Sequence, residues 1–192
     1  MATPGSTYHH GDLKTALVNS ALALLEEEGA AALSMRGVAR HAGVTSAAPY
    51  RHYPDRGALL SAVAAVGYRE LAEDLAEASP MPTTADELAD VAIAYVRFAL
   101  RRPALFRAMF GEPCDPTSPE RVEAAAAISA YVQAIVSRAF PASEPEALSD
   151  AVWALVHGLA FLFLDGKFEG ANSDDLDRRV RAAVHAVLSP AI

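Results

Sequence analysis

The chain has 192 residues, of which 52% are hydrophobic, and it carries a formal net charge of −8. These values predict a globular protein with a substantial core, and they exclude a protein that binds nucleic acid over its whole surface. The single cysteine, Cys114, excludes an internal disulfide framework and favours a cytoplasmic location. The first twelve residues lack the basic and apolar regions of a secretory signal.

Apolar residues recur at helical spacing along most of the chain, and alternating runs between hairpin turns are nearly absent. We therefore expect an all-α protein. The uncharged run at residues 151–164 is shorter than the roughly 20 residues of a membrane-spanning helix, and it is interpreted as a buried helix. No contact with a membrane is expected.

The first helix is expected at residues 12–28, with Gly29 as its left-handed end. Ser34 is a suitable N-cap for a second helix at residues 35–41, and Thr45 for a third at residues 46–53. Between them lie three residues that include a glycine, which allows the backbone of a tight turn. Two short helices joined in this way are the sequence form of a helix-turn-helix.

Asp55 is expected to cap a fourth helix that ends near Ala78, and the proline-containing segment 79–84 is the clearest break in the pattern. The predicted architecture is an N-terminal three-helix helix-turn-helix domain, residues 1–56, joined to a larger C-terminal helical bundle, residues 57–192. The bundle is predicted to contain helices at residues 85–101, 104–110, 119–140, 145–164 and 173–188, with loops at 111–119 and 165–173.

Positive charge is concentrated in the predicted helix-turn-helix. Between residues 34 and 56, Arg36, Arg40, Arg51 and Arg56 stand against Asp55, which gives a formal charge of +3, so the remaining residues carry −11. A basic island on an acidic protein favours a polyanion at one face and leaves the other faces indifferent to it.

If the third helix enters the major groove of double-stranded DNA, its exposed side chains meet base edges while flanking donors contact phosphates. A glycine-containing turn between short helices also occurs as plain structure in helical bundles, so spacing alone leaves both interpretations open. Tyr53 is expected in the core. Phosphate contacts are expected from Thr45, Tyr50, His52 and Arg56, and base contacts from Ser46, Ala47 and Arg51.

The segment "LSMRGVARHAGVT", followed by Tyr50, Arg51, His52 and Tyr53, resembles the N-terminal DNA-binding domain of TetR-family transcriptional regulators over residues 11–71. Pro49 departs from the Leu more common in that family, which could change the tilt of the helix. The segment "WALVHGLAFLFLDG" resembles the subgroup with a Trp-His-Gly signature in its regulatory domain. The resemblance implies a homodimer, whose last two long helices form an intersubunit four-helix bundle, and a ligand cavity in each regulatory domain.

Trp153, His157 and Phe161 are spaced four residues apart and share one helix face. They could line the cavity, or they could be ordinary packing residues with the imidazole hydrogen-bonded internally. Gly158 would allow a close helix approach, for example between subunits. With Phe106, Met109, Phe110 and Tyr131, to which the same alternative applies, they make up seven candidate ligand-binding residues.

The predicted function is a ligand-responsive repressor that binds a near-palindromic DNA operator as a homodimer and responds to a small, largely apolar effector. An all-helical enzyme with a histidine base is one alternative, but no nucleophile elbow, P-loop or dinucleotide fingerprint is present. An interaction module without DNA contact is the other, and it predicts no salt-dependent binding to any duplex. No catalytic residue, cofactor or metal-ligand set is expected.

Overall fold

The computed structural model describes residues 10–141, 144–168 and 173–188, and all regular secondary structure in these ranges is helical. The all-α prediction is confirmed. Two short 3₁₀ turns, η1 (Ala30–Ala32) and η2 (Pro49–Arg51), lie in the N-terminal half. The α-helices are α1 (His10–Glu28), α2 (Met35–His41), α3 (Arg56–Ala78), α4 (Ala85–Arg101), α5 (Pro103–Gly111), α6 (Pro119–Ala139), α7 (Pro145–Leu164) and α8 (Ser173–Leu188).

The caps predicted for α2 and α3 are confirmed. The Ser34 hydroxyl accepts a hydrogen bond from the Gly37 amide at 3.1 Å, and the Asp55 carboxylate accepts one from the Ala58 amide at 2.8 Å. Each cap satisfies an amide that the helix itself leaves unpaired. The turn after α2 depends on Gly43, whose φ of 68° is the left-handed conformation that glycine adopts without strain.

The third helix predicted at residues 46–53 is wrong, because only the 3₁₀ turn η2 forms there. Pro49 has no N–H, so it cannot donate to the Thr45 carbonyl as an α-helix would require. That carbonyl accepts instead from the Ala48 amide at 2.9 Å, one residue earlier. Thr45 is therefore not the N-cap of an α-helix, and residues 45–52 present their side chains from consecutive tight turns.

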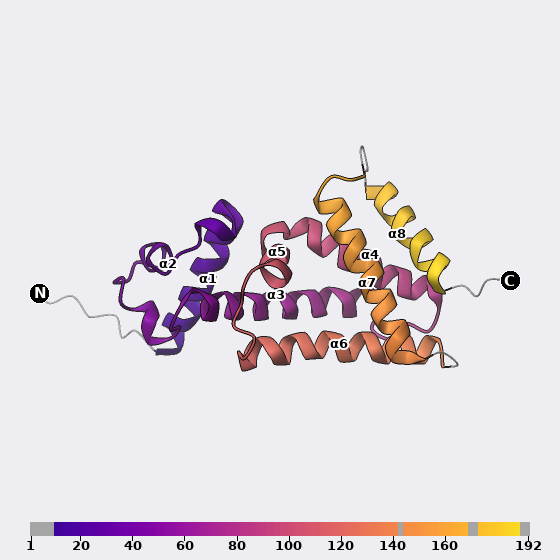
Figure 1. The fold of residues 1–192 in the computed structure, drawn as a ribbon, viewed down its shortest axis with the longest axis horizontal. Helices are drawn as coiled ribbons and strands as arrows, with labels where there is room; N and C mark the ends of the chain where they lie inside the picture. Colours follow the sequence, from indigo (N-terminus) through magenta and orange to yellow (C-terminus); the bar gives the residue numbers. More distant parts are fainter. Residues whose placement is uncertain (1–9, 142–143, 169–172, 189–192) are drawn as a thin grey trace, which may run out of the picture.

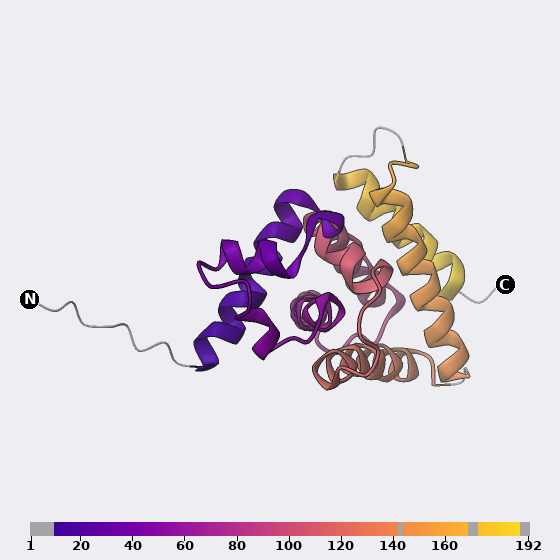
Figure 2. The same ribbon diagram turned by 60° about the vertical axis from the view of Figure 1, so that its left-hand side comes forward.

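Helix α3 is the axis of the molecule (Figure 1). The helices α1 and α2 lie at its start, and α4, α5 and α6 pack along the rest of it. Viewed along α3, the other helices surround it, as Figure 2 shows. The predicted break at residues 79–84 is only the connection from α3 to α4 inside the larger bundle. The proposed boundary near residue 56 coincides with the first residue of α3, whose buried Leu59 and Val63 show that this helix serves both halves.

Helix α7 is long and apolar enough to cross a membrane by length and composition, since all 20 residues from Pro145 to Leu164 are helical. Its inner face, with Val156 and Ala160, is buried against its neighbours. The expectation of a buried helix is wrong for the outer face, because Trp153 is 48% exposed and Leu162 is 42% exposed. A sequence pattern that is apolar all round does not reveal which side lacks a neighbour.

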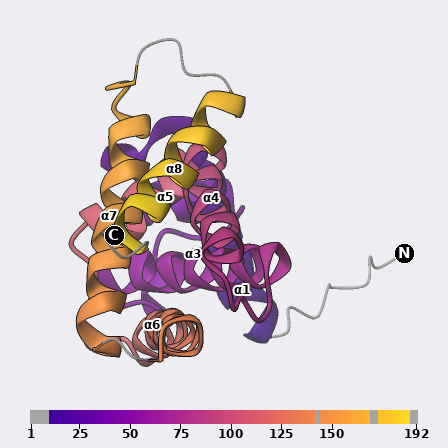
Figure 3. The ribbon, with the colours of Figure 1, turned by 90° about the vertical axis from the view of Figure 1, so that its right-hand side faces the viewer.

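Helices α7 and α8 lie side by side on the far side of the bundle from the helix-turn-helix (Figures 1 and 3). Ion pairs attach α8 to α4: Arg97 to Asp177 at 2.6 Å and Arg181 to Asp90 at 2.5 Å. These pairs are exposed, so each contributes little to stability, but together they fix the position of α8.

Candidate functional site

The surface formed by the turns after α2 is open to solvent. Of the residues predicted to contact DNA there, Thr45, Ser46, Ala47, Tyr50 and Arg51 are exposed and His52 is partly buried. The turns are held from below by the buried side chains of Pro49 and Tyr53. The placement of Tyr53 in the core is confirmed, since its side chain is 4% exposed.

Three arginines of this half, Arg36, Arg40 and Arg51, are exposed. None of them forms an ion pair with another residue in the part of the chain that the structure describes. A polyanion can therefore approach these guanidinium groups without displacing a carboxylate from them.

Arg56, unlike the other arginines of the helix-turn-helix, uses its guanidinium in hydrogen bonds within the chain. Its Nε donates to the Leu33 carbonyl at 3.0 Å, and its Nη2 donates to the Ala30 carbonyl at 2.6 Å and to the Glu112 carboxylate at 3.1 Å. The expectation of a phosphate contact is corrected on this ground, because these donors are used within the chain. Arg56 positions the connection between α1 and α2 relative to α3, which its spacing in the sequence could not reveal.

The loop after α5 also contacts the start of α3. The Asp115 amide donates to the Gly57 carbonyl at 3.5 Å, and the Ser61 hydroxyl lies 3.0 Å from the Gly57 carbonyl and 3.1 Å from the Asp115 carbonyl. Beside this contact, Lys14 of α1 pairs with Glu120 of α6 at 2.5 Å. The helix-turn-helix is thus joined to the bundle through the loop at residues 112–118 and the start of α6.

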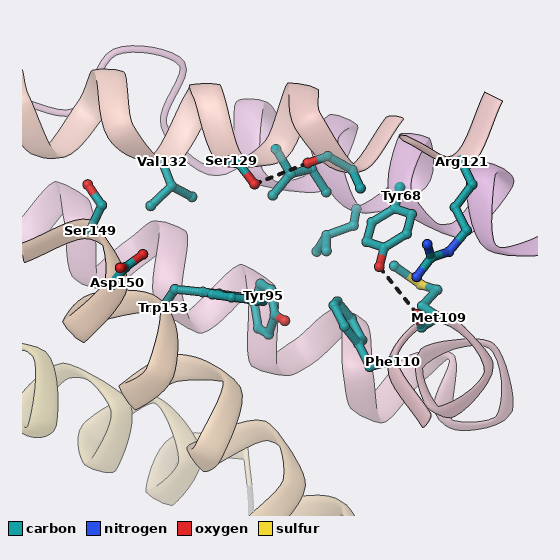
Figure 4. Close-up of a pocket in the computed structure, with 13 residues that line it drawn as sticks. Tyr68, Tyr95, Met109, Phe110, Arg121, Ser129, Val132, Ser149, Asp150 and Trp153 are labelled. Carbon is teal, nitrogen blue, oxygen red and sulfur yellow. Dashed lines mark hydrogen bonds between the residues drawn. The ribbon is translucent and has the colours of Figure 1, made fainter. Parts of the chain in front are cut away.

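A cavity of about 310 Å³ lies among α3, α4, α5, α6 and α7 (Figure 4). This is at the lower end of the volumes, about 300–1,000 Å³, that small-molecule sites occupy. Its walls are mainly apolar and aromatic, with polar groups at two ends. The apolar and aromatic lining consists of Tyr68, Leu71, Tyr95, Met109, Phe110, Ala125, Ile128, Val132 and Trp153, and the polar lining of Arg121, Ser129, Ser149 and Asp150.

Three of the seven candidate ligand-binding residues, Met109, Phe110 and Trp153, line this cavity. The other four do not. Tyr131 points elsewhere, because its hydroxyl donates to the Ser79 carbonyl at 2.8 Å and so holds the end of α3 against α6. Phe106, His157 and Phe161 pack together behind the cavity wall, with ring centroids 5.0 to 5.7 Å apart.

His157 is the centre of that aromatic cluster. Its Nδ1 lies 2.9 Å from the Tyr95 hydroxyl, which satisfies both polar groups. Burial lowers the pKa of His157 below its ordinary value of 6.5, because the charged imidazolium is poorly solvated there. The internally hydrogen-bonded imidazole is therefore neutral at pH 7.

Half of the cavity residues that sequence reasoning missed belong to α6. Arg121, Ala125, Ile128 and Val132 follow one another at intervals of four, three and four residues, which places them on one helix face. That periodicity was visible in the sequence, but it does not separate a helix face against a cavity from one against a solid core. Among the described residues, no group of three or more His, Cys, Asp or Glu side chains is placed to hold a metal ion.

Comparison with known proteins identifies the family of this chain. Residues 17–63 match the family described as bacterial regulatory proteins, tetR family, and residues 88–187 match the tetracyclin repressor-like C-terminal domain. The second match alone covers more than half of the chain. The protein belongs to the TetR family. The helix-turn-helix thus lies in the first matched part, and the cavity lining, apart from Tyr68 and Leu71, lies in the second.

Individual relatives agree with this assignment. The HTH-type transcriptional regulator Rv1816 of Mycobacterium tuberculosis is 36% identical over 93 residues, which are 46% of this chain but only 39% of that protein. A protein of unknown function from Rhodococcus sp. RHA1 is 34% identical, with a TM-score of 0.78 over 94% of this chain and 97% of that one. The TetR-family regulator PfmR from Thermus thermophilus, at 19% identity, shares the fold with a TM-score of 0.64 over 90% of this chain and 96% of that one.

Proposed function

We propose that this protein is a DNA-binding transcriptional repressor that acts in the cytoplasm as a homodimer on a near-palindromic operator. The observation that carries the proposal is the exposed surface of α2 and the turns that follow it, where Arg36, Arg40 and Arg51 have no ion-pair partner among the described residues. The family to which the chain belongs and the printed name of its mycobacterial relative support the same function.

Within that surface, Arg51 is the proposed base-reading residue, because it is exposed and its planar guanidinium suits the two acceptors of guanine. The exposed Ser46 and Ala47 are proposed as further base contacts. Thr45, Tyr50 and His52 are proposed to hold phosphates. Since these residues project from turns, their order along the groove follows the turn geometry and not the 3.6-residue period of a helix.

The proposed dimer interface is the outer face of α7 together with α8. Exposed small residues follow one stripe of α7, namely Ala147, Ala151, Ala154 and Gly158, and Leu162 ends it. A methyl group added at Gly158 would meet no atom of this chain within 4 Å, so a second helix can approach closely there. A second copy would bury this face, and the four helices would form a bundle. This accounts for the apolar outer surface of α7 without a membrane.

The interface is tested by a charge placed in its centre. Ala154→Arg should convert the dimer to a monomer in sedimentation experiments, because the charge would be buried without a partner. Ala76→Arg, at an exposed position on α3, is the matched control and should remain dimeric. A wild-type protein that is monomeric at micromolar concentration contradicts the proposed assembly.

The cavity is the proposed site of a small, largely apolar effector. Ligand in the cavity would favour an arrangement of the two helix-turn-helix units whose separation no longer matches the operator half-sites. The α5–α6 connection supports this route, because Met109 and Phe110 line the cavity and Glu112, two residues further, binds Arg56 at the start of α3.

Selection of bound sequences from random duplexes by the purified protein tests the proposed function. The expected result is a near-palindromic sequence whose half-sites are separated by about one helical turn, ~34–36 Å, or a multiple of it. Failure to enrich any sequence, together with no salt-dependent binding of any duplex, would contradict the proposal. An unpaired, non-repeated half-site would contradict the dimeric mode alone.

A further inference from the structure

The two polar ends of the cavity differ in charge. Figure 4 shows Arg121 at one end, next to Tyr68 and Met109, and Asp150 with Ser149 at the other, next to Trp153. Asp150 is exposed at the rim, whereas Arg121 is half-buried. A ligand that fills the cavity therefore meets a positive group at its inner end and a solvated negative group at its outer end.

Arg121 differs from the other arginines of the described chain because it is partly buried and yet forms no ion pair. Eight arginines of the described chain pair with carboxylates, and the unpaired Arg36, Arg40, Arg51, Arg69 and Arg138 are exposed to solvent. Arg121 is half-buried, and within the described ranges no carboxylate lies at ion-pair distance from it. Its Nε is buried and has no hydrogen-bond partner among the residues that the structure describes. A buried cationic donor without an acceptor is costly, so the site favours an added anion.

The groups that face Arg121 leave its Nε open to such an anion. The Tyr68 hydroxyl, beside the guanidinium, accepts a hydrogen bond from Arg121 and donates its own proton to the Met109 carbonyl at 3.2 Å. Asp115 is the nearby acid, but its carboxylate accepts hydrogen bonds from the amide and hydroxyl of Thr117 at 2.8 and 2.7 Å. Cys114 is the other neighbour, and burial raises the pKa of its thiol, which keeps it neutral.

The body of the cavity favours an apolar ligand. Leu71, Ile128, Val132 and Trp153 belong to its apolar lining. A smaller, almost wholly apolar cavity of about 40 Å³ adjoins it and shares Ile128, Val132 and Trp153 with it. The two hydroxyls that line the cavity already donate within their own helices, Ser129 to the Ala125 carbonyl and Ser149 to the Pro145 carbonyl. A second negative group on the ligand would therefore meet no free hydroxyl donor there and would lie near the Asp150 carboxylate.

We propose that the effector is an amphipathic organic monoanion, with its carboxylate on the Arg121 guanidinium and its apolar chain or ring between Ile128, Val132 and Trp153. This deepens the proposed function, because it names the chemical class of the ligand that the cavity takes. A dianion is disfavoured by Asp150 at the rim, and a neutral ligand leaves the Nε of Arg121 without a charged acceptor.

The position of Arg121 also connects the ligand to the helix-turn-helix. Arg121 lies in the first turn of α6, next to Glu120, which pairs with Lys14 of α1. The preceding loop holds the Gly57 carbonyl through Asp115 and holds Arg56 through Glu112. An anion that draws the guanidinium into the cavity therefore acts on the segment that joins the bundle to the start of α3.

The single tryptophan of the chain, Trp153, lines the cavity, so its fluorescence reports occupancy directly. The full chain is titrated without DNA with octanoate and 4-phenylbutanoate, each compared with its corresponding primary alcohol. Each acid is expected to bind at least about tenfold more tightly than its alcohol, since a charge-assisted pair with arginine adds that much. The tighter of the two acids identifies a chain or a ring as the apolar body.

Arg121→Gln is expected to bring each acid within about twofold of its alcohol, while binding of the alcohols changes little. Arg69→Gln, at an exposed arginine of α3, is the matched control and should keep the preference for acids. Arg121→Lys, which keeps the charge, should restore part of that preference. Thermal melting of each variant checks that it folds.

Equal binding of acid and alcohol by the wild type, or a preference for acids that survives in Arg121→Gln, overturns the proposal. Absence of any fluorescence response to all four compounds overturns it as well. Duplex binding measured on the same preparations separates these failures from failure of the proposed regulatory function, because DNA binding does not require the ligand.

Discussion

The Arg56 guanidinium and the Glu112 carboxylate lie 3.1 Å apart, so the first residue of α3 is joined to the loop that follows α5. The same guanidinium holds the Ala30 and Leu33 carbonyls between α1 and α2. One side chain thus contacts the helix-turn-helix, the central helix and the loop beside the cavity. A change at the cavity has a short physical path to the DNA-binding surface through this residue.

Arg56→Ala is expected to lower the free energy of unfolding by about 1–2 kcal/mol, because two carbonyls and a carboxylate lose a charged donor in a partly solvated setting. Chemical denaturation measures this. Arg36→Ala, which removes an exposed arginine of the neighbouring helix α2, should change stability by less than about 0.5 kcal/mol. If the two variants are equally stable and differ only in DNA affinity, Arg56 is a phosphate contact after all.

Gly67→Ala is expected to act on the cavity. A methyl group at this position of α3 would lie 2.5 Å from Sδ of Met109 and 3.1 Å from Cδ1 of Leu105. The flexible Met109 side chain would move into the cavity that it lines, and binding of octanoate, followed by Trp153 fluorescence, should weaken by about tenfold. The double variant Gly67→Ala/Met109→Ala should recover affinity, and unchanged binding by the single variant would show that Met109 moves elsewhere.

His157 predicts a pH dependence of stability. Its pKa is lower in the folded protein than the ordinary 6.5, so below that pH the unfolded chain binds more protons. The free energy of unfolding should therefore fall as pH decreases below about 6.5, towards the lowered pKa. His157→Gln leaves a hydrogen-bonding partner for Tyr95 but does not titrate, and its stability should vary less over this range. Identical slopes for the variant and the wild type would contradict the assigned environment.

Tyr53 and Tyr95 are both buried, but within the described part of the chain only the Tyr95 hydroxyl has a hydrogen-bond partner. Burial, with Glu120 nearby, raises the pKa of Tyr53 to about 12, so its hydroxyl stays protonated and its donor unpaired. Tyr53→Phe is expected to leave stability unchanged or to raise it by up to about 1 kcal/mol, whereas Tyr95→Phe should lower it by about 1 kcal/mol. Equal losses in thermal denaturation of both variants would indicate an unseen partner for Tyr53.

Much of the fold could be predicted from the sequence because local signals agreed with each other. The caps at Ser34 and Asp55 were each readable from a few neighbouring residues, and the structure uses them as expected. The prediction of an α-helix at residues 46–53 was wrong because Pro49 lacks the N–H that this helix would need, so the polar and apolar pattern of the segment did not determine its conformation.

The candidate sites were less predictable, because they depend on contacts between distant segments. Arg56 and Arg51 look alike in the sequence, yet only Arg56 finds carbonyls 23 and 26 residues away. His157 and Phe161 share the helix of Trp153, but they face the aromatic cluster and not the cavity. Arg121 has no carboxylate at ion-pair distance among the described residues. This depends on which residues of other segments lie near it, and the spacing of residues along α6 does not reveal that.

The most direct test of the account is the salt dependence of duplex binding by the wild type and by Arg51→Ala, on a selected operator and on a scrambled duplex. The wild type should bind the operator more tightly, with affinity falling steeply as salt rises. Arg51→Ala should weaken operator binding and reduce the preference over the scrambled duplex, since the exposed Arg51 is the proposed base reader. Unchanged affinity and preference in Arg51→Ala, or wild-type binding that salt does not affect, would contradict the placement of the DNA interface on this surface.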